Sequence, residues 1–207
     1  MTDVFGVLFV CTGNVCRSAM ADVLARSWLA HAVPGLSAAV RIESAGTGAP
    51  VGAAMSEPAQ QLMREAGVLD PGAHRARALD RDLVRSADLV LTATREHRAA
   101  VVRMLPSAAR RVFTVREIAE LAGRVPPERL AGPRDTAGDM RAAVRIIAGQ
   151  RGMGRGDTDA WDLEDPIGRP LGVYRHVLGE MWPALAEGLG AVLSVTFPQP
   201  PQPPPAG

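Results

Sequence analysis

The sequence predicts an α/β domain, a three-layer sandwich in which a central four-stranded parallel sheet carries helices on both faces. Short apolar segments alternate with longer segments of helical periodicity, which is the order that a parallel sheet requires. The first apolar segment, residues 4–10, is continuously hydrophobic, as in a strand that is buried on both faces. A short loop then leads directly to the start of a helix.

The predicted strands are short and rich in aliphatic and β-branched residues. We expect them at residues 4–10, 40–43, 89–92 and 111–114. Ligands of such sheets bind beyond the carboxyl ends of the strands. The loop that follows residue 10 therefore lies where a ligand is expected.

The predicted helices are marked by the residues at their ends. Ser18 is a candidate N-cap, Pro58 lies in a first turn, Gly67 is a stop signal, and Pro106 closes a further helix. The expected helices span residues 18–31, 59–66, 80–86, 95–104, 116–122, 135–150 and 171–189.

The chain of 207 residues has the length of one domain, which we place at residues 1–195. Residues 196–207 are rich in Pro and are expected to form a flexible tail in the polyproline II conformation. The alternative is that this tail binds a partner domain.

The overall composition excludes several classes of function. The formal net charge of +1 argues against a polyanion-binding surface and against nucleic acid as a partner. The first residues lack the positive charge of a signal peptide, and no segment approaches the ~20 apolar residues of a membrane-spanning helix. We therefore expect a cytoplasmic protein with no membrane partner. All 23 basic residues are Arg, which is typical of a GC-rich bacterial genome.

The cysteines and histidines point to neither a disulfide framework nor a metal site. The two cysteines, Cys11 and Cys16, lie in the same loop, and a reducing compartment suits a free reactive thiol. His31, His97 and His176 are scattered without the spacing of metal ligands. We expect no metal and no cofactor.

The loop from Cys11 to Arg17, Cys-Thr-Gly-Asn-Val-Cys-Arg, carries the strongest chemical signal. A loop between a strand and a helix start points N–H groups at an anion and adds the positive end of the helix dipole. Arg17 can bind two oxygens of that anion through its planar guanidinium. The same positive field stabilises a thiolate at Cys11. A nucleophile that faces a bound oxyanion is an arrangement like that of a phosphatase.

The alternative for Cys11 is a small buried hydrophobic residue, which is the usual environment of a free cysteine. Its neighbours oppose that interpretation. Gly13 permits close approach to a ligand, Asn14 tolerates the left-handed conformation, and Ser18 can donate a hydrogen bond to the sulfur. The expected phosphate-binding residues are Thr12, Gly13, Asn14, Val15, Cys16, Arg17 and Ser18.

Residues 10–18, followed by Met20 and Ala21, resemble the signature of the low-molecular-weight protein tyrosine phosphatase family. The Ser-Ala-Gly-Thr segment at 44–47, the His-Arg-Ala-Arg segment at 74–77 and the Asp-Pro pair at 165–166 extend this resemblance over most of the chain. It is weaker from 123 to 161, and the place of that segment before Asp165 predicts a lid or a pocket wall. The resemblance implies the cytoplasmic α/β fold of this family, whose scaffold arsenate reductases and arginine phosphatases share.

The resemblance also implies a mechanism. Cys11 would attack phosphorus to form a phosphocysteine, while Arg17 and the loop amides hold the equatorial oxygens. Asp165 would protonate the leaving group and then activate water. From the residues alone, Asp162 and Glu164 are competitors for this acid role.

The resemblance assigns supporting roles as well. It implies that Asn14, Ser18, Ser44 and His74 form a hydrogen-bond network that holds the loop in shape. It also implies that Cys16 can form a reversible disulfide with the nucleophile. The alternative for Cys16 is a packed small side chain.

The expected function is hydrolysis of phosphotyrosine in a phosphorylated protein substrate. Val15 favours an aryl phosphate, because the resemblance places Thr here in arginine phosphatases and often Ser in arsenate reductases. Ile167 points the other way, because tyrosine-specific members usually carry an aromatic residue there. The alternatives are a phosphoarginine phosphatase, an arsenate reductase that uses a small-molecule thiol, and a phosphate-binding module without activity. The sequence leaves the oligomeric state open.

Overall fold

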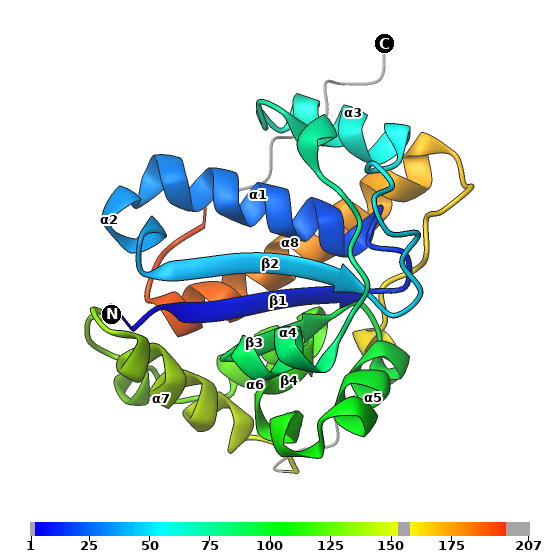
Figure 1. The fold of residues 1–207 in the computed structure, drawn as a ribbon. Helices are drawn as coiled ribbons and strands as arrows, with labels where there is room; N and C mark the ends of the chain where they lie inside the picture. The colour runs from blue at the N-terminus through cyan, green and yellow to red at the C-terminus, as the bar shows by residue number, and fades with distance from the viewer. Residues whose placement is uncertain (1–2, 153–157, 198–207) are drawn as a thin grey trace.

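The computed structural model describes residues 3–152 and 158–197, and it confirms the predicted parallel α/β architecture. Four parallel strands form one sheet in the order β2-β1-β3-β4 (Figure 1). The strands are β1 (Phe5–Cys11), β2 (Val40–Gly46), β3 (Leu89–Thr92) and β4 (Val112–Thr114). The central strand β1 pairs with β2 along its whole length, so Cys11 lies opposite Gly46 at the carboxyl end.

The predicted helices are present with ends close to the expected ones. They are α1 (Arg17–Ala32), α3 (Glu57–Glu65), α4 (Arg81–Ser86), α5 (Arg95–Met104), α6 (Val115–Gly123), α7 (Ala137–Ala148) and α8 (Leu171–Leu193). The sequence did not predict α2 (Pro34–Ser37) or the 3-10 turns at Pro71–Ala73, Pro106–Arg111, Pro127–Arg129 and Thr158–Trp161. Helix α3 ends just before Gly67, the predicted stop signal. Gly67 adopts a left-handed conformation, with φ of 82°.

The two faces of the sheet are covered by different helices. Phe5, Val7 and Phe9 belong to the larger core, which includes apolar side chains of α1, α6 and α8. Leu8 and Val10 belong to a smaller core with α4 and α5. Because alternate residues of β1 are buried on opposite faces, every one of its seven positions is buried, as the continuous hydrophobic segment predicted.

The expectation of a lid in the segment 123–161 is wrong for its central helix. Arg141 on α7 binds Asp3 at 2.6 Å and Asp88 at 2.7 Å. These carboxylates immediately precede β1 and β3, so α7 lies at the amino ends of the strands (Figure 1). The loop from Cys11 to Arg17, which we call the anion loop after its predicted ligand, lies at the opposite end of the sheet.

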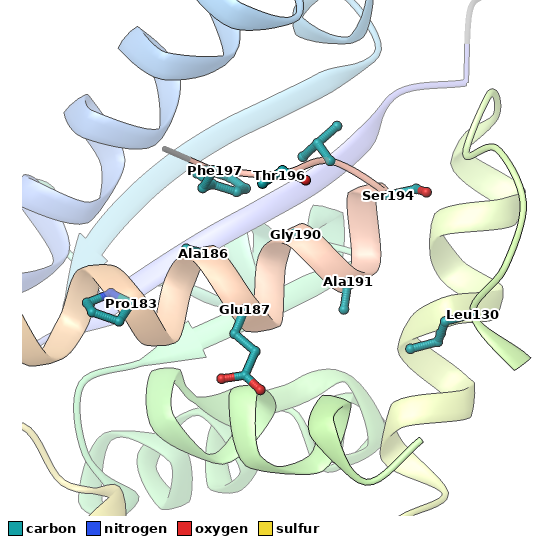
Figure 2. Close-up of a pocket in the computed structure, with 10 residues that line it drawn as sticks. Leu130, Pro183, Ala186, Glu187, Gly190, Ala191, Ser194, Thr196 and Phe197 are labelled. Atoms are coloured by element: carbon teal, nitrogen blue, oxygen red, sulfur yellow. The ribbon is translucent and has the colours of Figure 1, made fainter. Parts of the chain in front are cut away.

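The packed part of the chain continues past the expected boundary at residue 195. Ser194, with φ of 56°, ends α8, and Phe197 then stacks on Trp28 with ring centroids 4.0 Å apart. Trp182 meets the same ring edge-on at 5.7 Å. Figure 2 shows Thr196 and Phe197 above α8. Both residues line a pocket of about 590 Å³. The rest of the expected tail, 198–207, lies outside the described residues.

Candidate active site

The candidate site forms where the carboxyl end of β1 passes into the start of α1 (Figure 1). The loop between them is held by its neighbours at both ends. Thr47 and Gly48 donate their N–H groups to the carbonyls of Cys11 and Thr12, each at 2.9 Å. Ser56 donates its N–H to the carbonyl of Val15, also at 2.9 Å. The segment that follows β2 therefore wraps around the loop.

The sulfur of Cys11 is buried and receives hydrogen bonds from its own loop. The Asn14 N–H donates to Sγ at 3.2 Å, and the Ser18 hydroxyl lies 2.9 Å from it. The predicted N-cap role of Ser18 is wrong, because α1 begins at Arg17 with Cys16 in the N-cap position. Ser18 lies instead in the first turn, where its hydroxyl reaches the sulfur.

Asn14 is the centre of the network that shapes the loop. Its φ of 54° is left-handed, and its side chain is fully buried. Its Nδ2 donates to the Ser18 hydroxyl at 2.9 Å, and its Oδ1 accepts the Arg77 N–H at 2.9 Å. His74 Nε2 donates to the Asn14 carbonyl at 2.7 Å. These three hydrogen bonds hold a strained residue in place.

Arg17 brings together the loop and the Asp-Pro segment from the other end of the chain. Its guanidinium is 4% exposed and lies 2.6 Å from Asp165 Oδ2. It also donates to the Leu163 carbonyl at 3.2 Å. Among the described residues, Arg17 Nε has no hydrogen-bond partner although it is buried. An unused donor of this kind is costly unless a ligand satisfies it.

Of the three carboxylates that competed for the acid role, the structure brings Asp165 to the loop. Asp162 accepts hydrogen bonds from the backbone and side chain of Arg95. Glu164 lies 3.9 Å from the exposed Arg169. Asp165 remains 43% exposed, so water reaches it.

The side chain of Ser44 binds elsewhere than expected. Its hydroxyl donates to Asp22 Oδ2 of α1 at 2.7 Å rather than to the loop. Burial raises the pKa of the Asp22 carboxyl, and the neighbouring Arg26 opposes that shift. The carbonyl of Ser44 accepts from the side chain of Arg77, whose N–H binds Asn14. Ser44 therefore connects to the loop through Arg77 rather than by its own hydroxyl.

Cys16 contacts hydroxyl groups of two other segments. Its Sγ is 3.2 Å from the Ser56 hydroxyl and 3.7 Å from the hydroxyl of Tyr174 on α8. Burial raises the pKa of the Cys16 thiol, and the two hydroxyls oppose that shift. Both cysteines are free thiols in this structure.

Exposed aliphatic side chains stand on the segments beside the loop. Ile167 is 52% exposed, and its N–H donates to Asp165 Oδ1 at 3.2 Å. Val51 is 73% exposed on the segment that wraps the loop after β2. Val15, within the loop, is half-buried against the larger core.

Two contributors to the site were missed by sequence reasoning. A Cβ at Gly46 would lie 2.3 Å from the Thr12 carbonyl, so only glycine fits against the loop. His97 Nε2 lies 2.9 Å from the Thr12 hydroxyl. Its position just beyond the carboxyl end of β3 is the signal that could have found it.

Two features are absent from the described residues. Within residues 3–152 and 158–197, no group of three or more His, Cys, Asp or Glu side chains is arranged to hold a metal ion. No helix in that part of the chain is long and apolar enough to cross a membrane.

The fold and the loop together define a parallel α/β protein that presents a buried cysteine and a buried arginine in one loop between a strand and a helix. The family model described as low molecular weight phosphotyrosine protein phosphatase matches residues 6–126, and the chain belongs to this family. It is an enzyme of the low-molecular-weight phosphatase class, as the resemblance of its sequence predicted.

Similar proteins include phosphatases of two named kinds. A protein-arginine-phosphatase from Geobacillus stearothermophilus is 28% identical over 177 residues, covering 86% of this chain and 88% of that protein. Low molecular weight protein-tyrosine phosphatase A from Mycobacterium tuberculosis is 40% identical over 124 residues, 59% of this chain and 72% of that protein. A solved low molecular weight protein tyrosine phosphatase from T. tengcongensis is 29% identical, covers 88% of this chain and 96% of its own, and gives a TM-score of 0.62.

Proposed function

We propose that this protein hydrolyses phosphotyrosine in protein substrates, with Cys11 as the nucleophile and Asp165 as the general acid and base. One observation carries the proposal. The anion loop contains both the sulfur of Cys11, with two hydrogen-bonding groups beside it, and the buried guanidinium of Arg17. The half-exposed carboxylate of Asp165 lies 2.6 Å from that guanidinium. The unused Nε of Arg17 supports an anion as the ligand.

In the first chemical step, the Cys11 thiolate attacks phosphorus and forms a sulfur–phosphorus bond. The phosphorus–oxygen bond to the leaving group breaks, and Asp165 gives its proton to the departing oxygen. A phenolate needs this proton because its conjugate acid has a pKa of about 10. Arg17 and the loop amides stabilise the charge on the equatorial oxygens.

In the second step, water attacks the phosphocysteine. Its proton passes to the Asp165 carboxylate, the sulfur–phosphorus bond breaks, and inorganic phosphate leaves with the thiolate restored. The ion pair between Arg17 and Asp165 keeps the carboxyl group at the mouth of the loop before substrate arrives. An incoming phosphate would replace that carboxylate on the guanidinium, and the released carboxylate would take up from water the proton that it gives to the leaving group in the first step.

Phosphoarginine is the second candidate substrate, and specific observations favour it. Ile167 offers an exposed aliphatic wall rather than an aromatic ring beside Asp165. The relative named protein-arginine-phosphatase also aligns over 86% of this chain. Val15 favours the aryl phosphate instead, because a branched aliphatic side chain offers no hydrogen bond to a guanidinium.

The test is a steady-state assay of the reduced protein with p-nitrophenyl phosphate, phosphotyrosine peptide, phosphoarginine peptide and arsenate with a small-molecule thiol. We expect hydrolysis of the aryl phosphates and the highest kcat/KM for phosphotyrosine. Cys11→Ser should abolish turnover and retain phosphate binding. Failure to hydrolyse any aryl phosphate would refute the proposal, and a higher kcat/KM for phosphoarginine would select the second candidate.

A further inference from the structure

His97 is a buried imidazole beside the anion loop, and the proposed chemical steps do not use it. It lies in the first turn of α5 and is 7% exposed. Its Nε2 is 2.9 Å from Thr12 Oγ1, and its Nδ1 is 2.6 Å from Thr94 Oγ1. Thr12 directly follows the cysteine of the loop. The imidazole therefore links the start of α5 to the first residue after the nucleophile.

The hydrogen-bond partners favour one of the two ring nitrogens of His97 as the position of the hydrogen. Thr94 is the N-cap of α5, and its hydroxyl oxygen already accepts the His97 backbone N–H at 3.3 Å. Donation of the Thr94 hydroxyl hydrogen to Nδ1 gives that hydrogen an acceptor, whereas donation from Nδ1 would leave it without one among the described residues. A neutral imidazole then carries its single hydrogen on Nε2, where it points at Thr12 Oγ1. Burial and the positive charge of Arg17 lower the pKa of His97, which favours this neutral form.

The consequence for Thr12 is that its hydroxyl accepts from His97 and keeps its own hydrogen. Its backbone is also fixed, because the Thr12 carbonyl accepts the Gly48 N–H at 2.9 Å. Thr12 is exposed whereas His97 is buried. The Thr12 O–H is therefore available to an acceptor on the open side of the loop.

We propose that His97 is a positioning residue that makes the Thr12 hydroxyl a hydrogen-bond donor to a phosphoryl group bound in the loop 11–17. The identity of this ligand rests on the proposed function. In this scheme Thr12 touches the ligand, and His97 acts only through Thr12. Thr94 fixes the direction of the relay, which runs from Thr94 through His97 to Thr12 and the bound oxygen.

A relay that ran from Thr12 to His97 would predict the opposite effect of removing the imidazole. If the ring hydrogen were on Nδ1, Thr12 would donate its hydrogen to His97 and would have none for the ligand. Removal of the imidazole would then release the Thr12 hydroxyl. Phosphate affinity would stay the same or increase.

The experiment measures binding of inorganic phosphate by calorimetry, together with kcat and KM for p-nitrophenyl phosphate, on the full reduced chain. Thr12→Val and His97→Ala should each weaken phosphate binding by about tenfold or more, the range for one hydrogen bond to a charged ligand. Their double variant should bind as Thr12→Val does, because both remove the same interaction. Thr12→Ser and His97→Gln keep the donors and should restore affinity to within about threefold of wild type.

Rescue by these conservative variants separates positioning from a structural role. His176→Ala is the matched control, because it removes an imidazole that is 64% exposed on α8. If His97→Ala does not fold, the pair Thr12→Val and Thr12→Ser decides the test at an exposed position. The inference is overturned if His97→Ala binds phosphate as tightly as wild type, if the single effects add in the double variant, or if Thr12→Val equals Thr12→Ser.

The two proposals fail in different ways. Wild-type protein that binds phosphate through Thr12 and His97 but hydrolyses no aryl phosphate would refute the proposed function and support this inference. Wild-type protein that hydrolyses p-nitrophenyl phosphate, with phosphate binding unaffected in His97→Ala, would refute this inference alone.

Discussion

Gly46→Ala is expected to damage the site while the fold survives. Gly46 ends β2 opposite Cys11, and a Cβ added there would lie 2.3 Å from the Thr12 carbonyl oxygen and 3.0 Å from the Asn14 nitrogen. Ordinary contacts begin near 3.4 Å, so the loop must move by about 1 Å. A displacement of about 1 Å at a reacting group can cost about 100-fold in rate. The overpacking itself costs about 1–3 kcal/mol of unfolding free energy.

The assay is kcat/KM for p-nitrophenyl phosphate, with urea unfolding to confirm that the fold remains. Gly48→Ala is the matched control on the same turn, because its Cβ would lie 3.9 Å from the Thr12 side chain, an ordinary contact. We expect a loss of about 100-fold for Gly46→Ala and a change of less than about threefold for Gly48→Ala. Equal activities in the two folded variants would refute the argument that β2 packs directly against the loop and fixes its position.

Three other changes test separate parts of the structure. Asp165→Asn should slow the hydrolysis of aryl phosphates with poor leaving groups much more than that of activated ones, because only the former need a proton. Equal slowing of both would mean that another residue is the general acid. Burial raises the pKa of Cys16, so iodoacetamide at pH 7 should alkylate Cys11 first. Labelling of Cys16 should increase only at higher pH. Peptide mass spectrometry that finds Cys16 labelled first would contradict this. Phe197→Ala should lower the unfolding free energy by about 3–5 kcal/mol in urea, and a loss below about 1 kcal/mol would mean that its ring is not part of the core.

Local signals in the sequence were sufficient for the strands and for the longer helices, though not for α2 or the 3-10 turns. The continuous hydrophobicity of β1, the Pro58 and Gly67 boundaries of α3 and the alternation of short and long segments each depend on neighbouring residues. Such signals report burial and backbone preference directly. The N-cap at Ser18 failed because the hydroxyl serves the sulfur of Cys11, and this tertiary contact overrides a local preference.

The candidate site also contains residues that the sequence could identify and residues that only the structure could distinguish. The loop residues follow one another in the chain, so Cys11, Asn14 and Arg17 could be found from their spacing together with the predicted strand before them and the predicted helix after them. Asp165 was chosen from Asp-Pro and a family resemblance, and residue types by themselves did not separate it from Asp162. The structure separates them, because Arg95 holds Asp162 while Arg17 holds Asp165.

The sequence by itself determined a strand, an anion loop and a helix in immediate succession, because each depends on contacts within a few residues. The tertiary structure alone decided that Gly46 must lack a side chain, that His97 meets Thr12, and that α7 lies at the far end of the sheet. These features join residues that lie tens of positions apart. Their geometry is set by the strand order and the packing of whole helices, which leave no periodic trace in the sequence.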